Sequence, residues 1–255
     1  MKITLILLLI LVFSVPVISA ENEKNVTQVS TINAILEGLY DGEITFGELK
    51  KFGNFGLGYF HELGGVVIGL DGEFFRFKEN GLAEPAKDND KSPFFTIVNF
   101  KPDNDNYTNR KFSYDQLKEY LYTMMPRKKS IYAIKIFGTF PKLQATTFPR
   151  QMKPYLPLAK ILKTLVYQTF TNTEGALVGF YIPEIFSDLN IPGFHFHFLQ
   201  KNKLRGGHIV DVNTDSITIE IVEISSLKLI LPGSSQFQKS DLSRNYTKDL
   251  GKLIR

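Results

Sequence analysis

Three of the four histidines in this chain lie within one short segment, at His195, His197 and His208. Side chains alternate across a β-strand, so a strand over 193–199 would place His195 and His197 on one face and the intervening phenylalanines on the other. The Gly206-Gly207 pair permits a backbone turn that brings His208 alongside on the neighbouring strand. The spacing therefore predicts three imidazoles that converge on one point.

This histidine set suits a zinc ion. Three neutral imidazoles leave a position open for water or substrate, as in catalytic zinc sites, and the ion can act as a Lewis acid on a carbonyl oxygen. The chain has no cysteine, which excludes thiolate ligands, disulfides and a cysteine nucleophile. The alternative is an ordinary hairpin with histidines on its polar face. We predict one Zn²⁺ per chain. His61 is expected to lie at the surface or to contact a metal ligand, and not to bind the metal itself.

A second stretch with chemical potential runs from Phe148 to Tyr155 and contains Arg150 between two prolines. A guanidinium held at the end of a strand can form a fixed fork for a carboxylate. The alternative is a surface arginine without a function. Arg150 is therefore a candidate for binding a carboxylate.

The elements that must position these residues follow from hydrophobic periodicity and from turn and capping signals. Helices are predicted over 28–39, in a short segment opened by the capping-box spacing of 45–48, over 113–125 and over 157–166. Residues 103–111 are expected to form a polar loop. Predicted strands cover 66–70, 73–77, 96–100, 131–140, 142–148, 176–182, 193–199, 208–212, 216–222 and 227–231.

Strands outnumber helices in this pattern, and few pairs of strands are separated by a crossover helix. That arrangement favours an α+β fold with mixed or antiparallel sheets over a doubly wound parallel sheet. Two domains are predicted, an N-terminal α+β domain over 21–155 and a C-terminal β-rich domain over 156–255 that carries the histidine hairpin.

Residues 1–20 have the pattern of a secretory signal peptide with cleavage after Ala20, which predicts a secreted protein. The alternative is an uncleaved anchor helix, but the apolar run is shorter than the ~20 residues that span a bilayer. No membrane partner is expected after cleavage.

Asn25, Asn106 and Asn245 each begin a sequon, and the sequence does not decide whether any of them is glycosylated. The 30 basic and 26 acidic residues are interspersed, so no nucleic-acid partner is expected.

Taken together, these stretches resemble the α-acetolactate decarboxylase family from Gln28 to about Asp249. The motifs that carry the resemblance are Phe55-Gly56-Leu57-Gly58, Leu70-Asp71-Gly72-Glu73-Phe74, Pro149-Arg150-Gln151, Lys153-Pro154-Tyr155, the 192–199 segment and Gly206-Gly207-His208-Ile209-Val210-Asp211. The resemblance implies two domains, each built on a β-sheet, with zinc held between them by His195, His197 and His208. It also implies that Arg150 faces the substrate. A homodimer is one assembly that the resemblance allows.

The chemistry implied by the resemblance is the non-oxidative decarboxylation of 2-acetolactate, a 2-hydroxy-3-oxo acid, to acetoin. Zinc would polarise the ketone, and an acid would deliver the proton that replaces the carboxylate. The chain departs from the family pattern at Tyr59, where the family usually has threonine, and at Val66, where it usually has glutamate. The C-terminal residues 251–255 also lack the family's glutamate. Water or Glu62 could replace these carboxylates.

The departures leave alternatives to an acetolactate decarboxylase. One is a non-catalytic or substrate-shifted secreted homologue that keeps the metal, because the ligands persist while two carboxylates are missing. Another is a cupin-like metal oxygenase, which also carries His-x-His on a strand. That class normally adds a glutamate soon after the second histidine, and residues 200–203 supply none.

Overall fold

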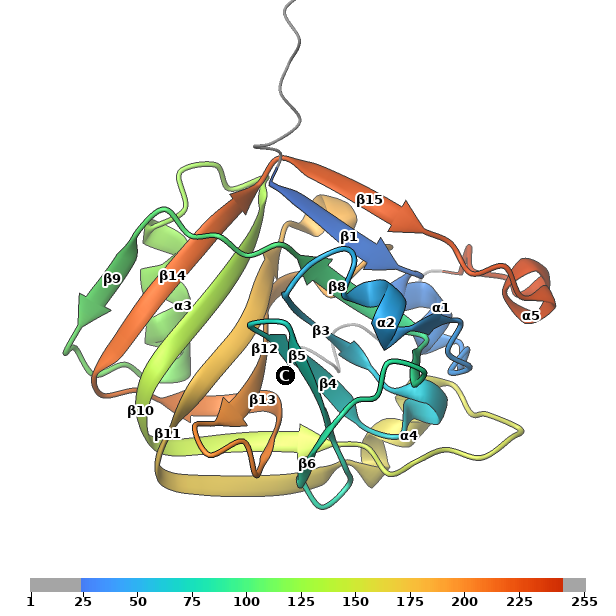
Figure 1. Cartoon of the computed structure of the whole chain (residues 1–255), viewed down its shortest axis with the longest axis horizontal. Coiled ribbons are helices and arrows are strands. Elements are labelled where there is room, and N and C mark those ends of the chain that lie inside the picture. The colour runs from blue at the N-terminus through green and yellow to red at the C-terminus, as the bar shows by residue number, and fades with distance from the viewer. Residues whose placement is uncertain (1–23, 245–255) are drawn as a thin grey trace, which may run out of the picture.

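The computed structural model of the protein describes residues 24–244 and contains two large β-sheets that lie side by side (Figure 1). The predicted signal peptide, the Asn245 sequon and the C-terminal residues 251–255 lie outside the described residues. None of the helices within 24–244 is long and apolar enough to cross a lipid bilayer.

The first sheet has seven strands in the order β15-β1-β8-β3-β4-β5-β6. Its pairings are antiparallel except that β1 and β15 run parallel, so the C-terminal part of the chain adds a strand beside the N-terminal one. The strands are β1 (Asn25–Val29), β3 (Phe55–Tyr59), β4 (Val66–Leu70), β5 (Glu73–Phe77), β6 (Ala83–Pro85), β8 (Phe94–Val98) and β15 (Ser226–Ile230). A small sheet pairs β2 (Ile44–Thr45) with β7 (Lys91–Ser92).

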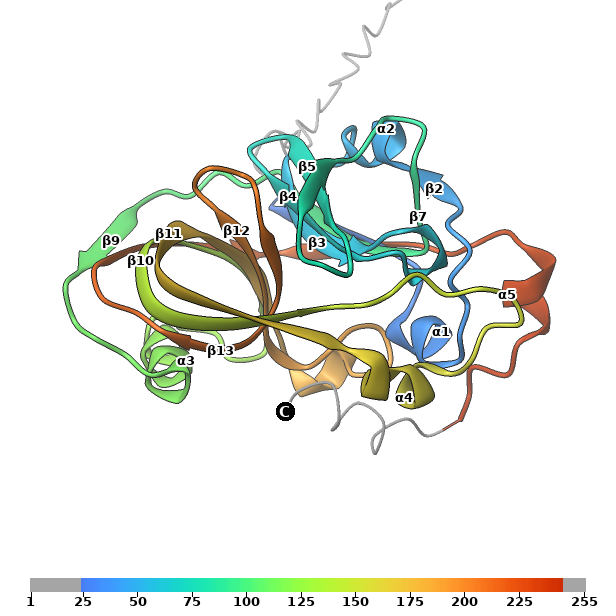
Figure 2. The same ribbon diagram turned by 90° about the horizontal axis from the view of Figure 1, so that it is seen from below.

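The second sheet has six strands in the order β11-β12-β13-β10-β14-β9. Because β11 also pairs with β10, the strands β10 to β13 close into a ring, and the strong curvature of β10 and β11 is visible in Figure 2. The strands are β9 (Asp105–Thr108), β10 (Ile131–Thr147), β11 (Val166–Ile182), β12 (Gly193–Gln200), β13 (Gly206–Asn213) and β14 (Ile217–Ile224).

The prediction of two strands separated at Pro141 was wrong, because β10 is a single strand of 17 residues. Phe140 pairs with Thr173 and Lys142 pairs with Thr171, so the ladder continues on both sides of the proline. Proline lacks a backbone N–H, and the strand changes its other partner at this point, from β14 before Pro141 to β13 after it.

The helices are short and lie outside the two sheets. They are α1 (Ile32–Leu36), α2 (Phe46–Leu49), α3 (Tyr114–Thr123), α4 (Leu158–Ile161) and α5 (Ser235–Lys239), with 3₁₀ turns η2 (His61–Leu63), η3 (Leu162–Thr164) and η4 (Glu184–Phe186). The predicted capping box of Thr45 with Glu48 is confirmed, and Ser113 forms a second one with Gln116 at the start of α3. Each box satisfies backbone N–H groups that a helix start leaves unpaired.

Two local predictions were wrong because tertiary pairing prevails over local pattern. The helix expected over 28–39 is only α1, and the residues before it form β1 between β8 and β15, where Val26 and Val29 are buried. The loop expected over 103–111 contains β9, an exposed edge strand paired with β14.

The α+β class with mixed and antiparallel sheets is confirmed. The sheets do not divide the chain at residue 155, because β9 and β10 precede that position in the second sheet and β15 follows it in the first. A shared core fills the space between the sheets. It contains Leu57 and Val66 from the first sheet and Val178, Phe180 and Leu199 from the second.

Candidate metal centre and active site

The histidines lie on the β12–β13 hairpin, where His197 is directly opposite His208. As the strand alternation predicts, Phe196 and Phe198 point to the opposite face and are fully buried in the core of the second sheet. His195 and His197 are also buried, with 3% and 1% of their surface exposed.

The role of the two glycines differs from the prediction. The turn of the hairpin lies between Gln200 and Arg205, and Gly206 and Gly207 belong to β13. A Cβ atom on Gly206 would collide with the carbonyl oxygen of Phe198 on the facing strand. Gly206 is therefore needed for the close approach of the two strands.

The three imidazoles converge. Nε2 of His195 lies 3.0 Å from Nδ1 of His208, and one ring nitrogen from each histidine can be chosen so that all lie within 4.8 Å of one another. The ring centroids are 5.1 Å apart for His195 and His197, 4.8 Å for His195 and His208, and 5.6 Å for His197 and His208. These residues can hold a metal ion.

A contact from the first sheet fixes the orientation of His197. Its Nδ1 lies 2.7 Å from the carbonyl oxygen of Val67 on β4, so Nδ1 carries the proton and donates it. Nε2 of His197 then presents a lone pair, and within residues 24–244 it is buried without a hydrogen-bond partner, as is Nδ1 of His195. An unpaired buried polar atom costs about 1–3 kcal/mol. The orphaned Nε2 of His197 fits a metal ion that would satisfy it.

The histidines are uncharged at neutral pH. Burial holds the pKa of His195 well below its ordinary value, and the neighbouring His208 and His197 lower it further. Burial, and then the charge of His208, lowers the pKa of His197 to about 3, although the bond to Val67 acts in the opposite direction. Burial lowers the pKa of His208 to about 4. Neutral imidazoles have the free lone pairs that metal binding needs.

A cavity of about 350 Å³ opens beside His208. Two of its walls come from neighbouring strands: Val66 on β4 is directly opposite Tyr59 on β3, and Thr146 on β10 is directly opposite His208. The lining residues are Tyr59, Val66, Thr146, Phe148, Ala159, Leu162, Lys163, Leu165, Tyr167, Ile191, His208 and Val210. Val66, which the sequence places where the family usually has a glutamate, thus shares this cavity with a candidate metal ligand.

Arg150 lies elsewhere and is paired with a carboxylate. Its Nε and one terminal nitrogen donate to Glu62, and 71% of the Arg150 side chain is exposed. Arg150 is not among the residues that line the cavity beside His208. The role of Arg150 toward a substrate stays a prediction. His61 also lies outside the histidine cluster, where its Nδ1 accepts a hydrogen bond of 2.9 Å from the Gly42 N–H.

Sequence reasoning missed several residues that line the cavity. Tyr59 was noticed only as a departure from a motif, because no strand was predicted over 55–59; it lies on β3, directly opposite Val66 on the next strand. Ala159 and Lys163 come from α4 and η3, whose helical pattern predicted an element but not its neighbours. Burial raises the pKa of the Tyr59 phenol, which therefore stays protonated.

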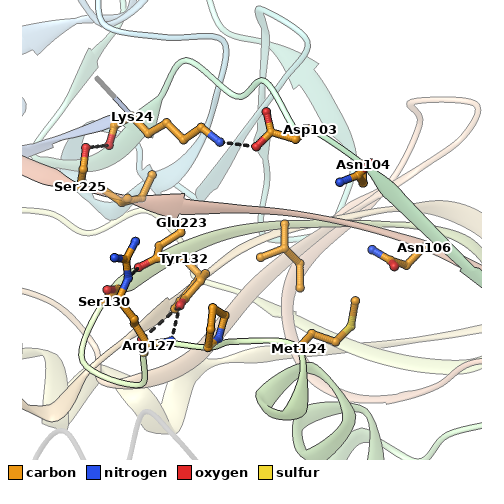
Figure 3. A pocket seen from close by; sticks show the side chains of 13 residues that line it. Lys24, Asp103, Asn104, Asn106, Met124, Arg127, Ser130, Tyr132, Glu223 and Ser225 are labelled. Atoms are coloured by element: carbon orange, nitrogen blue, oxygen red, sulfur yellow. Dashed lines mark hydrogen bonds and ion pairs between the residues drawn. The ribbon is translucent and has the colours of Figure 1, made fainter. Parts of the chain in front are cut away.

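A larger cavity of about 710 Å³ lies at the other end of the second sheet and shares no lining residue with the first (Figure 3). Its charged groups are paired with one another, Lys24 with Asp103 and Arg127 with Glu223. The Tyr132 hydroxyl donates to the carbonyl oxygen of Arg127 at 3.1 Å. The charged groups of the larger cavity are therefore paired with one another, whereas the smaller cavity is lined by His208, one of the three converging histidines.

Known proteins resemble this chain over almost all of its described length. Residues 26–244 match the family model of alpha-acetolactate decarboxylase. An alpha-acetolactate decarboxylase from Bacillus subtilis is 34% identical over 89% of both chains, and one from Methanosarcina mazei is 35% identical over 94% of this chain and 83% of its own length.

Solved structures agree with the sequence relatives. The crystal structure of the Bacillus subtilis alpha-acetolactate decarboxylase superposes with a TM-score of 0.87 at 33% identity and covers 90% of this chain and 98% of its own. A Staphylococcus aureus protein of unknown function, described as similar to alpha-acetolactate decarboxylase, gives a TM-score of 0.84 at 29% identity, with coverage of 91% and 98%. The chain therefore belongs to the alpha-acetolactate decarboxylase family of carboxy-lyases.

Proposed function

We propose that this protein is a secreted, zinc-dependent decarboxylase that converts 2-acetolactate to acetoin and carbon dioxide without oxidation. The observation that carries the proposal is the convergence of three uncharged histidines, His195, His197 and His208, of which His208 lines a cavity and the other two each have a buried nitrogen without a partner among the described residues. The names of the relatives support the substrate, since they are called alpha-acetolactate decarboxylases.

In this proposal His195, His197 and His208 hold one Zn²⁺. Zinc supplies a Lewis acid for the hydroxyl and ketone oxygens of the substrate. Val67 contributes through its carbonyl oxygen, which holds His197 in the tautomer that presents Nε2.

The cavity wall contributes by excluding water from the reacting end of the substrate. Val66, Phe148 and Ile191 are buried apolar side chains on this wall. A carboxylate loses its charge when it leaves as carbon dioxide, so surroundings that solvate charge poorly favour its departure.

Arg150 is proposed to bind the substrate carboxylate or an adjacent oxygen through charge-assisted hydrogen bonds. The guanidinium would have to exchange its bonds to Glu62 for bonds to the substrate. An exposed ion pair contributes only about 0–1 kcal/mol, so this exchange costs little. Glu62, once released, is a candidate to hold or relay a proton, and water is the other candidate.

A second candidate function is a homologue that binds the metal but does not decarboxylate. The observation in its favour is that no carboxylate lines the cavity among the residues that the structure describes. The cupin-like oxygenase alternative has no support, since residues 26–244 match a different family. A homodimer also remains a proposal.

The deciding experiment uses the secreted chain without residues 1–20. Carbon dioxide and acetoin released from racemic 2-acetolactate are measured for the purified protein, after removal of metal with a chelator, and after zinc is restored. The proposal expects turnover that is lost with the chelator and returns with zinc. Zinc-loaded, folded protein that releases neither product would favour the non-catalytic homologue.

A further inference from the structure

The segment between η4 and β12 has no regular helix or strand and leads directly into the strand that bears His195 and His197. Asn190 lies in this segment and is 3% exposed. A connection of this kind takes its position from the individual contacts that it makes, because no regular set of backbone hydrogen bonds fixes it. The partners of Asn190 therefore bear on where β12 begins.

Both polar atoms of the Asn190 side chain are hydrogen-bonded. Its Nδ2 donates to Oε1 of Gln28 on β1 at 2.7 Å and to Oγ1 of Thr96 on β8 at 2.9 Å. Its Oδ1 accepts the backbone N–H of Ile191 at 2.8 Å. Gln28 and Thr96 are directly opposite each other in the first sheet, and both are buried. Asn190 thus joins two neighbouring strands of the first sheet to the segment that enters β12.

Gln28 holds the same segment by a second contact. Its Nε2 donates to the carbonyl oxygen of Leu189 at 2.5 Å, and the backbone N–H of Ile32 donates to that oxygen at 2.9 Å. A buried amide that loses its partner is left unpaired away from water, which is unfavourable. A buried polar network whose members are all satisfied is rigid for this reason. The network therefore fixes the segment against the first sheet.

The histidines depend unequally on direct contacts with the first sheet. Nδ1 of His197 donates to the carbonyl oxygen of Val67. His195 differs, because its Nε2 lies against His208 and, within residues 24–244, its Nδ1 is buried without a hydrogen-bond partner. The place of the His195 ring therefore depends on the backbone of β12 and on packing, and the entry to β12 is held at Asn190.

We infer that Asn190 is a positioning residue for the metal centre. Through Gln28 and Thr96 it holds the start of β12 against the first sheet, and it thereby fixes the place of the His195 ring. This inference rests on the proposed function, because it gives Asn190 a role toward a proposed zinc ligand. Asn190→Leu nearly keeps the volume of the side chain but leaves the two acceptors without their donor, so the entry to β12 should shift.

Histidine-selective isotope labelling and nuclear magnetic resonance test the inference without metal, because the chain has only four histidines. The signals are assigned by replacing each histidine in turn. In metal-free Asn190→Leu the ring signals of His195 should shift, while those of His61, which lies outside the cluster, should stay at their wild-type positions. Thr96→Val removes one acceptor of Asn190 and should shift the His195 signals less, and it decides the matter if Asn190→Leu does not fold. Unchanged His195 signals in the folded variant would overturn the inference.

Tyr132→Phe is the matched control. It removes the hydrogen bonds of the hydroxyl of the buried Tyr132, which lines the larger cavity, so it should lower the melting temperature without moving the His195 signals. Zinc affinity, measured by competition with a chelator, should fall about tenfold in Asn190→Leu and stay at the wild-type value in Tyr132→Phe.

The outcomes separate this inference from the proposed function. A shift of the His195 signals, or a loss of zinc affinity, that is equal in Asn190→Leu and Tyr132→Phe would show that lowered stability is the cause and would overturn the inference. Wild-type protein that binds no zinc would reject the proposed metal centre. The metal-free spectra would still decide whether Asn190 positions His195.

Discussion

The histidine cluster and Arg150 are the two features that the sequence indicated for chemistry, and the structure shows them in contrast: nitrogens of the cluster have no partner among the described residues, whereas Arg150 is paired with Glu62. In the cluster, Nδ1 of His195 and Nε2 of His197 are buried and unpaired within the described chain. In the pair, Arg150 is largely exposed and its guanidinium already binds a carboxylate. A ligand satisfies the first grouping, whereas it must displace a partner in the second.

The elements that carry the two groupings explain the difference. The histidines project from paired strands, and Val67 of the other sheet holds His197 in place. Arg150 lies in the segment that follows β10, and Glu62 lies in η2 with a left-handed φ of 58°. A site on strands is fixed before a ligand arrives, whereas a site on connecting segments can rearrange.

Removal of a histidine should have the largest effect. His197→Ala deletes a nitrogen of the cluster, so zinc affinity should fall by more than the ~10–100-fold that is typical when only a hydrogen-bond partner of a metal ligand is lost. Zinc content after dialysis against a competing chelator measures this loss. His61→Ala is the control, because His61 lies outside the cluster and should leave zinc content unchanged. Equal zinc content in wild type and His197→Ala would reject the proposed ligand set.

Addition of a carboxylate to the cavity should give the next largest effect. Val66→Glu places an acid on the wall beside His208, and a positioned acid should raise the rate of acetoin release by about tenfold. Val66 is only 1% exposed, so the new carboxyl should also lower the melting temperature.

Val66→Gln is the matched control for that variant, because it has a similar shape and cannot donate a carboxyl proton. Acetoin release is measured for the three proteins with zinc content checked in each. A gain in Val66→Gln equal to that in Val66→Glu would show that shape matters and proton delivery does not. Rapid turnover by the wild type, with no gain in Val66→Glu, would show that another group already delivers the proton.

Acidification should destabilise the metal-free protein through the histidine cluster. The folded-state pKa values of about 3 for His197 and about 4 for His208 lie below the unfolded value of about 6.5. The unfolded chain therefore binds protons first, and the free energy of unfolding falls as the pH drops from about 6.5 toward 4. Urea titrations of metal-free protein at several pH values measure the slope. His208→Gln should have a shallower slope in this window, and an unchanged slope would show that His208 is not the cause.

The same comparison shows what the sequence could and could not predict. The histidine convergence depends on strand alternation and a hairpin, which are local patterns, and it was confirmed. The contact between Val67 and His197 spans 130 residues and the contact between Arg150 and Glu62 spans 88, so no local pattern indicates either. Likewise Gln28 and Val29 were predicted to be helical, whereas they end β1, whose neighbours β8 and β15 lie far away in the chain.

The smallest effect on stability is expected at Arg150. Arg150→Ala breaks an ion pair of an exposed side chain, and such pairs contribute about 0–1 kcal/mol, so the free energy of unfolding should change by no more than that. If Arg150 exchanges Glu62 for the substrate, KM for 2-acetolactate should rise by about tenfold or more, because charge-assisted hydrogen bonds are lost.

Glu62→Gln tests the same exchange from the other side. It removes the charge that competes with the substrate for Arg150, so it should lower KM if Glu62 only competes. If Glu62 also handles the proton, kcat should fall while KM falls too, since the two roles affect different steps. An unchanged KM in Arg150→Ala would show that Arg150 pairs with Glu62 but does not bind the substrate. The carboxylate of the substrate would then have to be bound from within the cavity, where Lys163 is the one cationic side chain in the described lining apart from a protonated His208.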